Sequence, residues 1–371
     1  MKKIEIDTGY LTEMLISLLN IHSPSGYSDQ IVHFVGQELE RLGLQFDVTR
    51  RGTIRATMSG QKESFDRCVS AHLDTLGAMI RELKPNGRLA VSPVGNWSAR
   101  FAEGARVTVF SEQGPVRGTV IPIKSSGHVY GEEIDHLPVS WDNVEVRVDQ
   151  RCEDAAALKE MGFEVGDFLA FDATPEITDS GYINARHLDD KAGVAILLAV
   201  IKAFKDKKIK ISVDCHFLFT IFEEVGLGAS SGLFKDVSEM VVVDHAPLAE
   251  RQNGSEFGAT ICMMDQMGPY DYHLIKKLTG LCKKHKLSYT KDIFKYYKSD
   301  SASVIEAGND TRTALIGFGL DASHGYERVH MDSLVTTALL TAYYIQSPPT
   351  FMRDVTEYSS LEGFPHQPTR R

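Results

Sequence analysis

The feature that most constrains this chain is a long stretch without helical periodicity inside an otherwise alternating pattern. Before about Gly77 and after about Ala170, segments with apolar residues at helical spacing alternate with short apolar runs typical of strands. Between those points, short β-rich pieces are separated by Gly, Pro, Asn and Asp, as in a small barrel or sandwich. The simplest interpretation is an α/β domain interrupted by an all-β insertion.

We therefore expect residues 1–76 and 171–371 to form one discontinuous catalytic α/β domain, and residues 77–170 to form a β-rich inserted domain. The apolar segments Val213–Ile221 and Met240–Asp244 are typical of strands buried on both faces of a parallel sheet. The predicted fold class is α/β: a mixed, mostly parallel sheet sandwiched by helices, with a small all-β barrel-like insertion. A chain of 371 residues suits two such domains.

Charge and cysteine usage narrow the class of partner and compartment. The sequence carries 40 Lys and Arg against 50 Asp and Glu, a formal net charge of −10. Nucleic acids and anionic membranes bind clustered positive charge, so neither is expected as a partner. No apolar stretch approaches the ~20 residues that a membrane span needs. Five single cysteines without a C-x-x-C pair favour a reducing compartment, and we expect a cytoplasmic protein.

Five polar clusters stand where apolar strands end, which is where open α/β sheets place their ligand sites. They are Ser70–Gly77 (SAHLDTLG), His187–Gly193 (HLDDKAG), Phe217–Gly228 (FLFTIFEEVGLG), Met240–His245 (MVVVDH) and Asp321–Glu327 (DASHGYE). Together they supply imidazoles and carboxylates, which suit zinc, manganese or cobalt. Two such ions that share a bridging ligand can activate a water together.

The first two clusters have structural explanations as well as chemical ones. Residues two apart on a strand face the same way, so His72 and Asp74 can share a site in which the carboxylate holds the imidazole. A strand end with a polar turn explains the same pair about as well. Asp189 and Asp190 could complement the dipole of the helix that follows, or Asp189 could give one oxygen to each of two cations.

The third cluster is the most specific, because Glu223 and Glu224 end a very apolar strand. Two acids in such a place are costly unless they have cationic partners. A natural division is one carboxylate on a metal ion and its neighbour as general base toward water. Both reach one site only if the strand gives way to a turn, which Gly226 and Gly228 permit.

The last two clusters are less decisive. Asp244 ends an apolar strand, and His324 lies in a loop after the apolar strand Thr313–Phe318. Taken singly, each is equally compatible with a structural role and with a place in the site.

The ordered set H-x-D, D-D-[RK]-x-G, E-E-V-G, V-D and a late histidine resembles the dinuclear-metal aminopeptidases, a family that includes deblocking glutamyl aminopeptidases and tetrahedral (TET) aminopeptidases. The resemblance covers about Leu11 to Ile345. It implies removal of N-terminal residues from peptides and two divalent metal ions per chain, zinc in the first place, with cobalt or manganese as alternatives. It also implies self-association, in many members as a dodecamer, with the β insertion contributing to the contacts.

Carried over residue by residue, the resemblance assigns roles within the five clusters. The implied metal ligands are His72, Asp189, Glu224, Asp244 and His324. In this assignment Asp189 bridges both ions, Glu223 is the general base and Asp74 orients His72. The sequence departs from the family pattern at Thr75 (commonly Glu), Lys191 (commonly Arg), Gly228 (commonly Arg) and in S-H-G-Y-E, which replaces H-S-P-x-E. None of these departures removes a ligand.

Other functions remain open on the residues alone. A metal-dependent deacylase or amidase acting on a small acylated amino acid or dipeptide would use a similar ligand set, and a non-catalytic binding or shell protein could retain the fold. A nucleophilic hydrolase is disfavoured because the sequence has no G-x-S-x-G elbow. Carbohydrate hydrolysis by Glu223 and Glu224 is disfavoured because glycosidase acids flank one bond from opposite sides.

Overall fold

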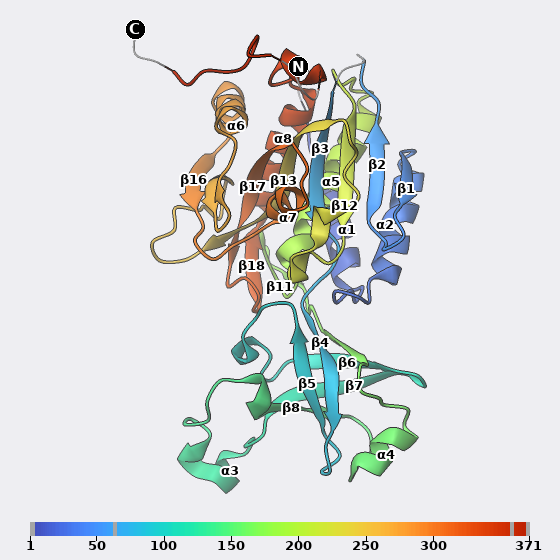
Figure 1. Cartoon of the computed structure of the whole chain (residues 1–371). Coiled ribbons are helices and arrows are strands. Elements are labelled where there is room, and N and C mark those ends of the chain that lie inside the picture. Colours follow the sequence, from blue (N-terminus) through green and yellow to red (C-terminus); the bar gives the residue numbers. More distant parts are fainter. Residues whose placement is uncertain (1–3, 62–64, 357–359, 369–371) are drawn as a thin grey trace.

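A twelve-stranded sheet forms the larger part of the computed structural model, which describes residues 4–61, 65–356 and 360–368 (Figure 1). Nine of its strands lie in the order β1 (Gln45–Val48), β2 (Ile54–Met58), β12 (Cys215–Thr220), β3 (Asp66–His72), β13 (Val237–Leu248), β17 (Arg312–Asp321), β18 (Glu327–His330), β11 (Tyr182–Ala185) and β10 (Glu176–Ile177). A side branch adds β14 (Ala259–Asp265), which pairs with β17, β15 (Gly268–Pro269) and β16 (Tyr289–Ile293).

The predicted mixed sheet is confirmed, and along the nine-strand path its parallel pairing is confined to the centre. The parallel pairs there are β12 with β3, β3 with β13, and β13 with β17. The strands on both flanks pair antiparallel. Strands β3 and β12 are buried along their whole length, which explains why these two segments read as continuous apolar runs.

Helices cover this sheet, and α5 (Leu188–Asp206) is the most deeply buried of them. It packs against β3 and β13, and also against α1 and α8. The other helices of this domain are α1 (Thr8–Leu19), α2 (Asp29–Arg41), α6 (Tyr272–His285), α7 (Asp300–Glu306) and α8 (Met331–Gln346). Within the described residues, none of the helices combines the length and apolar character needed to cross a bilayer.

The all-β insertion is a closed six-stranded barrel that hangs below the sheet in Figure 1. Its strands, in order around the barrel, are β4 (Gly77–Leu83), β5 (Leu89–Val94), β8 (Val144–Val148), β7 (Gly114–Pro122), β6 (Arg106–Ser111) and β9 (Phe168–Phe171). Its short helices are α3 (Gly127–Tyr130) and α4 (Ala155–Glu160). The barrel has a hydrophobic core of its own, separate from the core under the sheet. Two independent apolar cores account for the change of pattern along the sequence.

The barrel joins the sheet domain at the carboxyl ends of the central strands. The chain leaves β3 at His72 and enters β4 at Gly77. At the same junction, the ring of Tyr27 stacks on Phe110 of β6 with centroids 4.4 Å apart. The barrel is therefore held next to the edge at which a ligand site is expected in an open α/β sheet.

Candidate metal centre

Three neighbouring central strands and the turns that follow them place His72, Glu223, Glu224 and Asp244 at one edge of the sheet. His72 is the last residue of β3, and it lies opposite Thr220, the last residue of β12. Glu223 and Glu224 follow within the next turn, and Asp244 lies in β13 on the other side of β3. Because β13 and β3 are parallel and Val242 pairs with Ser70, Asp244 inside β13 lies level with His72 at the end of β3.

A sharp turn lets both glutamates face the site. Phe222 has a left-handed backbone with φ +65°, and Gly226 has φ +79°. The turn is fixed by Asp74, whose carboxylate accepts hydrogen bonds from the backbone N–H of Glu223 (3.1 Å) and of Glu224 (3.3 Å). The hydroxyl of Ser25 donates to the same carboxylate at 2.5 Å. The predicted turn is thus present, and Asp74 holds it.

The two ring nitrogens of His72 have different partners: one faces the main chain of Asp74, and the other faces the carboxylates of Asp189 and Glu223. Its Nδ1 lies 2.9 Å from the backbone carbonyl of Asp74, which can only accept, so Nδ1 is the donor. The Asp74 carboxylate is farther, with Oδ1 3.7 Å from Nδ1. The opposite nitrogen, Nε2, lies 3.1 Å from Oδ1 of Asp189 and 3.6 Å from Oε2 of Glu223. The support of His72 therefore comes from the main chain of Asp74 rather than from its carboxylate.

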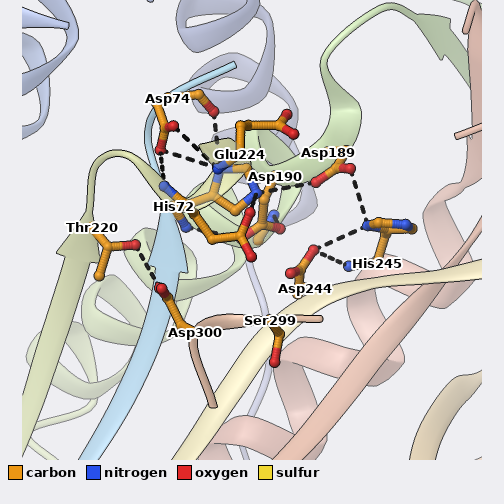
Figure 2. Close-up of polar contacts among 12 residues, drawn as sticks. His72, Asp74, Asp189, Asp190, Thr220, Glu224, Asp244, His245, Ser299 and Asp300 are labelled. Atoms are coloured by element: carbon orange, nitrogen blue, oxygen red, sulfur yellow. Dashed lines mark hydrogen bonds and ion pairs between the residues drawn. The ribbon is translucent and has the colours of Figure 1, made fainter. Parts of the chain in front are cut away.

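Asp189 lies between the histidines, as Figure 2 shows for His72 and His245. Its Oδ1 faces His72, while its Oδ2 is 3.4 Å from Nε2 of His324 and 3.2 Å from Nδ1 of His245. Nε2 of His324 is also 3.6 Å from Oε2 of Glu224. The two oxygens of one carboxylate thus face two different sets of donors.

The remaining predicted ligand, Asp244, belongs to the same assembly. Donor atoms of three residues lie within 4.8 Å of one another in each of three overlapping groups. The groups are His72–Asp190–Asp244, His72–Asp189–Glu224 and Asp189–Asp244–His245. All seven residues singled out in the sequence are therefore gathered at this edge of the sheet.

Carboxylates outnumber imidazoles at this site, and the excess of negative charge tests whether metal ions fit. The acids are Asp74, Asp189, Asp190, Asp244, Asp300, Glu223 and Glu224, and the imidazoles are His72, His245 and His324. Most of these side chains are buried, while those of Glu223 and His324 are 13% and 30% exposed. Within the described parts of the chain, the ion pairs of these acids are with histidine only. Burying so much negative charge is costly unless cations neutralise it. Bound divalent ions would do so.

The pKa values shift as expected for such a crowded site. Burial, reinforced by the neighbouring Asp189 carboxylate, raises the pKa of Glu224 to about 8. Burial would raise the pKa of Asp189 too, but the nearby imidazoles, His245 foremost, hold it well below the usual range. Burial opposes a charge on His324, yet the Asp189 and Glu224 carboxylates raise its pKa to about 9.

Donor spacing agrees with shared metal ions. Two ligand atoms on one zinc ion, at bond lengths of ~2.0–2.1 Å in a near-tetrahedral arrangement, are separated by ~3.3 Å. The contacts of Asp189 with His72 and His324 are 3.1 and 3.4 Å. Imidazole and carboxylate ligands of this kind suit zinc, cobalt or manganese. The residues present therefore fit divalent metal ions.

Comparison of the sequence with known protein families identifies the family of this chain. The family model described as M42 glutamyl aminopeptidase matches residues 52–340. The chain belongs to this M42 family. A Bacillus subtilis (strain 168) relative named as an aminopeptidase, YhfE, is 37% identical over 337 residues, covering 91% of this chain and 97% of the relative. The glutamyl aminopeptidase of Lactococcus lactis is 25% identical over 58% of this chain and 61% of its own length.

Solved structures share the M42 fold. An aminopeptidase from the archaeon Desulfurococcus kamchatkensis superposes with a TM-score of 0.82 at 20% identity, covering 94% of this chain and 97% of that one. The TET1 peptidase of Pyrococcus horikoshii, whose description says it can assemble into a tetrahedron or a large octahedral shell, gives 0.79 at 21% identity, covering 90% and 99%. Family membership makes this chain a metal-dependent peptide-bond hydrolase of the aminopeptidase type. It does not favour a deacylase or a non-catalytic shell protein.

The M42 site opens into a cavity of about 1020 Å³. Its inner wall includes Asp189, Glu223, Glu224 and His324, and its outer wall includes the segment 294–298. The barrel contributes Gly95 and Asn96. The backbone carbonyl of Asn96 also accepts a hydrogen bond from Nδ1 of His324 at 3.2 Å. The inserted barrel is therefore part of the site, because it supports one of the predicted ligands.

Several residues of the M42 site were missed by sequence reasoning. They are Asp190, His245, Asp300 and Glu327. His245 is next to Asp244, and strand alternation would turn it to the other face. Instead its backbone N–H donates to Oδ1 of Asp244 at 2.6 Å and its Nδ1 lies 3.1 Å from the same atom. Asp300 has no motif around it, so only the fold could reveal it.

Proposed function

We propose that this aminopeptidase hydrolyses N-terminal residues from peptides with a water held by two divalent metal ions, zinc in the first place and cobalt or manganese as alternatives. The observation that carries the proposal is the position of Asp189, whose two carboxylate oxygens face His72 and His324 at 3.1 and 3.4 Å. A carboxylate placed in this way can bridge two ions, and a bridged pair is what dinuclear hydrolysis requires.

The ligands divide into two sets around that bridge. His72 and Asp244 would hold one ion, Glu224 and His324 would hold the other, and Asp189 would contribute to both. The grouping of His72 with Asp244, and the 3.6 Å between His324 and Glu224, support this division. When bound, the ions would supply a water with a pKa lowered toward ~7 and positive charge beside the developing oxyanion.

Glu223 is the proposed general base. Its Oε2 lies 3.6 Å from Nε2 of His72, at the inner wall of the cavity, and burial raises its pKa well above the usual range. Glu223 would take a proton from the attacking water as the new C–O bond forms. It would then return that proton to the leaving amine nitrogen as the C–N bond breaks. Asp74 acts indirectly, by fixing the turn that presents Glu223 and by holding His72.

The Glu223→Gln variant separates the base from the metal ligands. Removing a general base lowers turnover by ~100-fold or more, while the variant should still bind two metal ions. Glu224→Gln should instead lose affinity for one ion. The control is Glu256→Gln, because the carboxylate of Glu256 pairs with Arg328 at 2.7 Å and belongs to no proposed ligand set. Turnover of a free-N-terminal peptide and metal content are the measurements. A fully active Glu223→Gln enzyme would refute the assignment.

We also propose that the subunits self-associate, as a dodecamer in the first instance, and that the protein is cytoplasmic. In this proposal residues 1–76 and 171–371 form the catalytic domain and residues 77–170 the oligomerisation domain. The dodecamer named in the description of one TET1 structure, which matches with a TM-score of 0.78, supports the assembly. Five free cysteines support a reducing compartment. Light scattering of the purified protein tests the assembly, and a monomer at micromolar concentration would contradict it.

A further inference from the structure

A single buried carboxylate connects the loop that leads into α5 at Asp189 with the loop that carries His324. Oε2 of Glu327 accepts a hydrogen bond from the backbone N–H of Asp189 at 3.2 Å. Oε1 of the same side chain accepts from the backbone N–H of His324 at 2.9 Å. Glu327 is only 2% exposed. Its two oxygens are thus used to hold the main chain of two residues that both belong to the proposed metal site.

Sheet register explains how Glu327 reaches both loops. It is the first residue of β18, which pairs antiparallel with β11, and Glu327 lies opposite Ala185. Ala185 is the last residue of β11, so the chain runs from there directly into the loop that reaches Asp189. On its own strand, Glu327 follows His324 by three residues. The carboxylate is therefore placed between the loops by the strand pairing itself.

Both loops need such an anchor because their backbones are unusual. His187 has φ +66°, and Ala322 and His324 have φ +56° and +67°, in the left-handed region that residues other than glycine rarely adopt. Conformations of this kind persist only when the surrounding structure holds them. The bonds to Glu327 fix the backbone nitrogen of each loop, and the Asn96 carbonyl fixes the ring of His324.

The buried charge of Glu327 supports a role in holding the backbone of Asp189 and His324. Over residues 4–61, 65–356 and 360–368, no ion pair involves Glu327, although its carboxylate is buried. Arg186 and His245 act on this carboxylate electrostatically without forming an ion pair with it, and in the described structure its hydrogen bonds come from two backbone N–H groups. Burying a carboxylate without a direct ion pair is costly, and two N–H donors compensate only in part. An uncharged side chain would fill the same space at the start of β18 with a smaller desolvation cost. Only a carboxylate has two equivalent acceptor oxygens that can serve two N–H groups at once.

We infer that Glu327 is a positioning residue that sets the distance between Asp189 and His324, and through it the affinity of the ion shared by Glu224, His324 and Oδ2 of Asp189. This inference rests on the proposed two-metal function. Oδ2 of Asp189 and Nε2 of His324 are 3.4 Å apart, close to the spacing expected for two ligands on one ion. A change in either loop alters that spacing. His72, which faces the other oxygen of Asp189, is held separately by the Asp74 carbonyl and the Asp190 carboxylate.

Metal titration of Glu327→Gln tests the inference. Glutamine retains one acceptor oxygen but presents an NH₂ group to the second N–H, so one of the two bonds is lost. Loss of an outer-shell partner typically weakens metal binding by ~10–100-fold. We expect that loss at one ion only, measured by calorimetry with zinc, together with a changed visible absorption spectrum of the cobalt-loaded protein. Glu327→Asp, which keeps the charge on a shorter side chain, should fall between Glu327→Gln and the unmodified protein.

Glu239→Gln is the matched control, because Glu239 is also a buried glutamate of the same sheet, at 1% exposure, and pairs with Arg67 away from the site. It should lower thermal stability without changing either metal affinity. Equal affinity of Glu327→Gln and the unmodified protein for both ions would overturn the inference, as would an equal loss at both ions. If the unmodified protein itself bound fewer than two ions, the proposed function would fail instead. If Glu327→Gln does not fold, the same two measurements are made on Glu327→Asp, for which a smaller loss of affinity at one ion is expected.

Discussion

The carboxylate of Asp300 occupies the space that a side chain on Gly228 would need. A Cβ added to Gly228 would lie 1.7 Å from Oδ1 of Asp300. Asp300 begins α7 and accepts hydrogen bonds from the backbone N–H of Ala229 at 2.7 Å and the hydroxyl of Thr220 at 2.5 Å. It therefore ties α7 to both ends of the turn that carries the paired glutamates. Arg is common at the position of Gly228 in the family that the sequence motifs resemble. In this chain the absence of a side chain at Gly228 leaves room for the Asp300 carboxylate.

Gly228→Ala should consequently be destabilising. Overpacking a closed site costs about 1–3 kcal/mol, and displacement of Asp300 should also lower turnover because the turn is no longer tied down. Urea unfolding measures the first effect. Gly280→Ala, in the exposed middle of α6 with open space around the new Cβ, is the control and should leave stability unchanged or raise it by up to ~1 kcal/mol. Unaltered stability of Gly228→Ala would contradict the close contact.

Metal affinity should depend on pH through His324. The Asp189 and Glu224 carboxylates outweigh burial and raise the pKa of His324 to about 9 in the metal-free protein. A metal ion needs the neutral imidazole, so binding must displace this proton, and apparent affinity should rise about tenfold per pH unit between pH 8 and 9. Below pH 8 the rise should be steeper, because Glu224, with a pKa of about 8, must then lose a proton as well. Calorimetry in buffers of different ionisation enthalpy counts the protons released. Affinity that is constant over this range would exclude the displacement.

The same shift predicts the stability of the metal-free protein. Because the pKa of His324 is raised above its usual value of 6.5, the folded state holds an extra proton. The stabilisation is therefore fully present below about pH 6.5 and is lost as the pH rises through about 9. Melting temperatures of the metal-free protein should fall across this window, and less so in His324→Asn. A melting temperature that rises from pH 6.5 to 9 would contradict the sign.

A buried ion pair at the other end of the sheet should matter for stability alone. Nη2 of Arg67 lies 2.7 Å from Oε1 of Glu239, and the two side chains are 0% and 1% exposed. Nη1 of Arg67 also donates to the carbonyl of Tyr344 at 2.6 Å, next to the end of α8. Glu239→Gln leaves the Arg67 charge buried without a carboxylate, which costs about 3–5 kcal/mol. Urea unfolding should show this loss with kcat unchanged, and a loss below ~1 kcal/mol would contradict the prediction.

The part of the site that is predictable from the sequence is the part carried by buried parallel strands. His72, Glu223 and Asp244 each stand at or near the end of an apolar run, and parallel pairing then brings such ends together. The turn after β12 is also foreseeable from Gly226. Gly228, expected to permit that turn, serves instead to leave room for Asp300.

The supporting residues are not predictable in this way, because their roles depend on contacts between distant segments. Glu327 reads as an ordinary strand residue, and only the register of β18 with β11 reveals its bond to Asp189. Asp300 reads as an ordinary helix start. His72 and Asp74 were expected to pair through their side chains, yet β3 ends at His72, so the main chain of Asp74 turns back to the imidazole.

The proposed pair of ions is tested most directly by anomalous diffraction at the zinc edge from crystals of the zinc-loaded protein. We expect two anomalous peaks per chain, ~3.5–4 Å apart, one beside Oδ1 of Asp189 and His72 and the other beside Oδ2 and His324. A single peak in a fully loaded crystal, or two peaks that do not share Asp189, would contradict it.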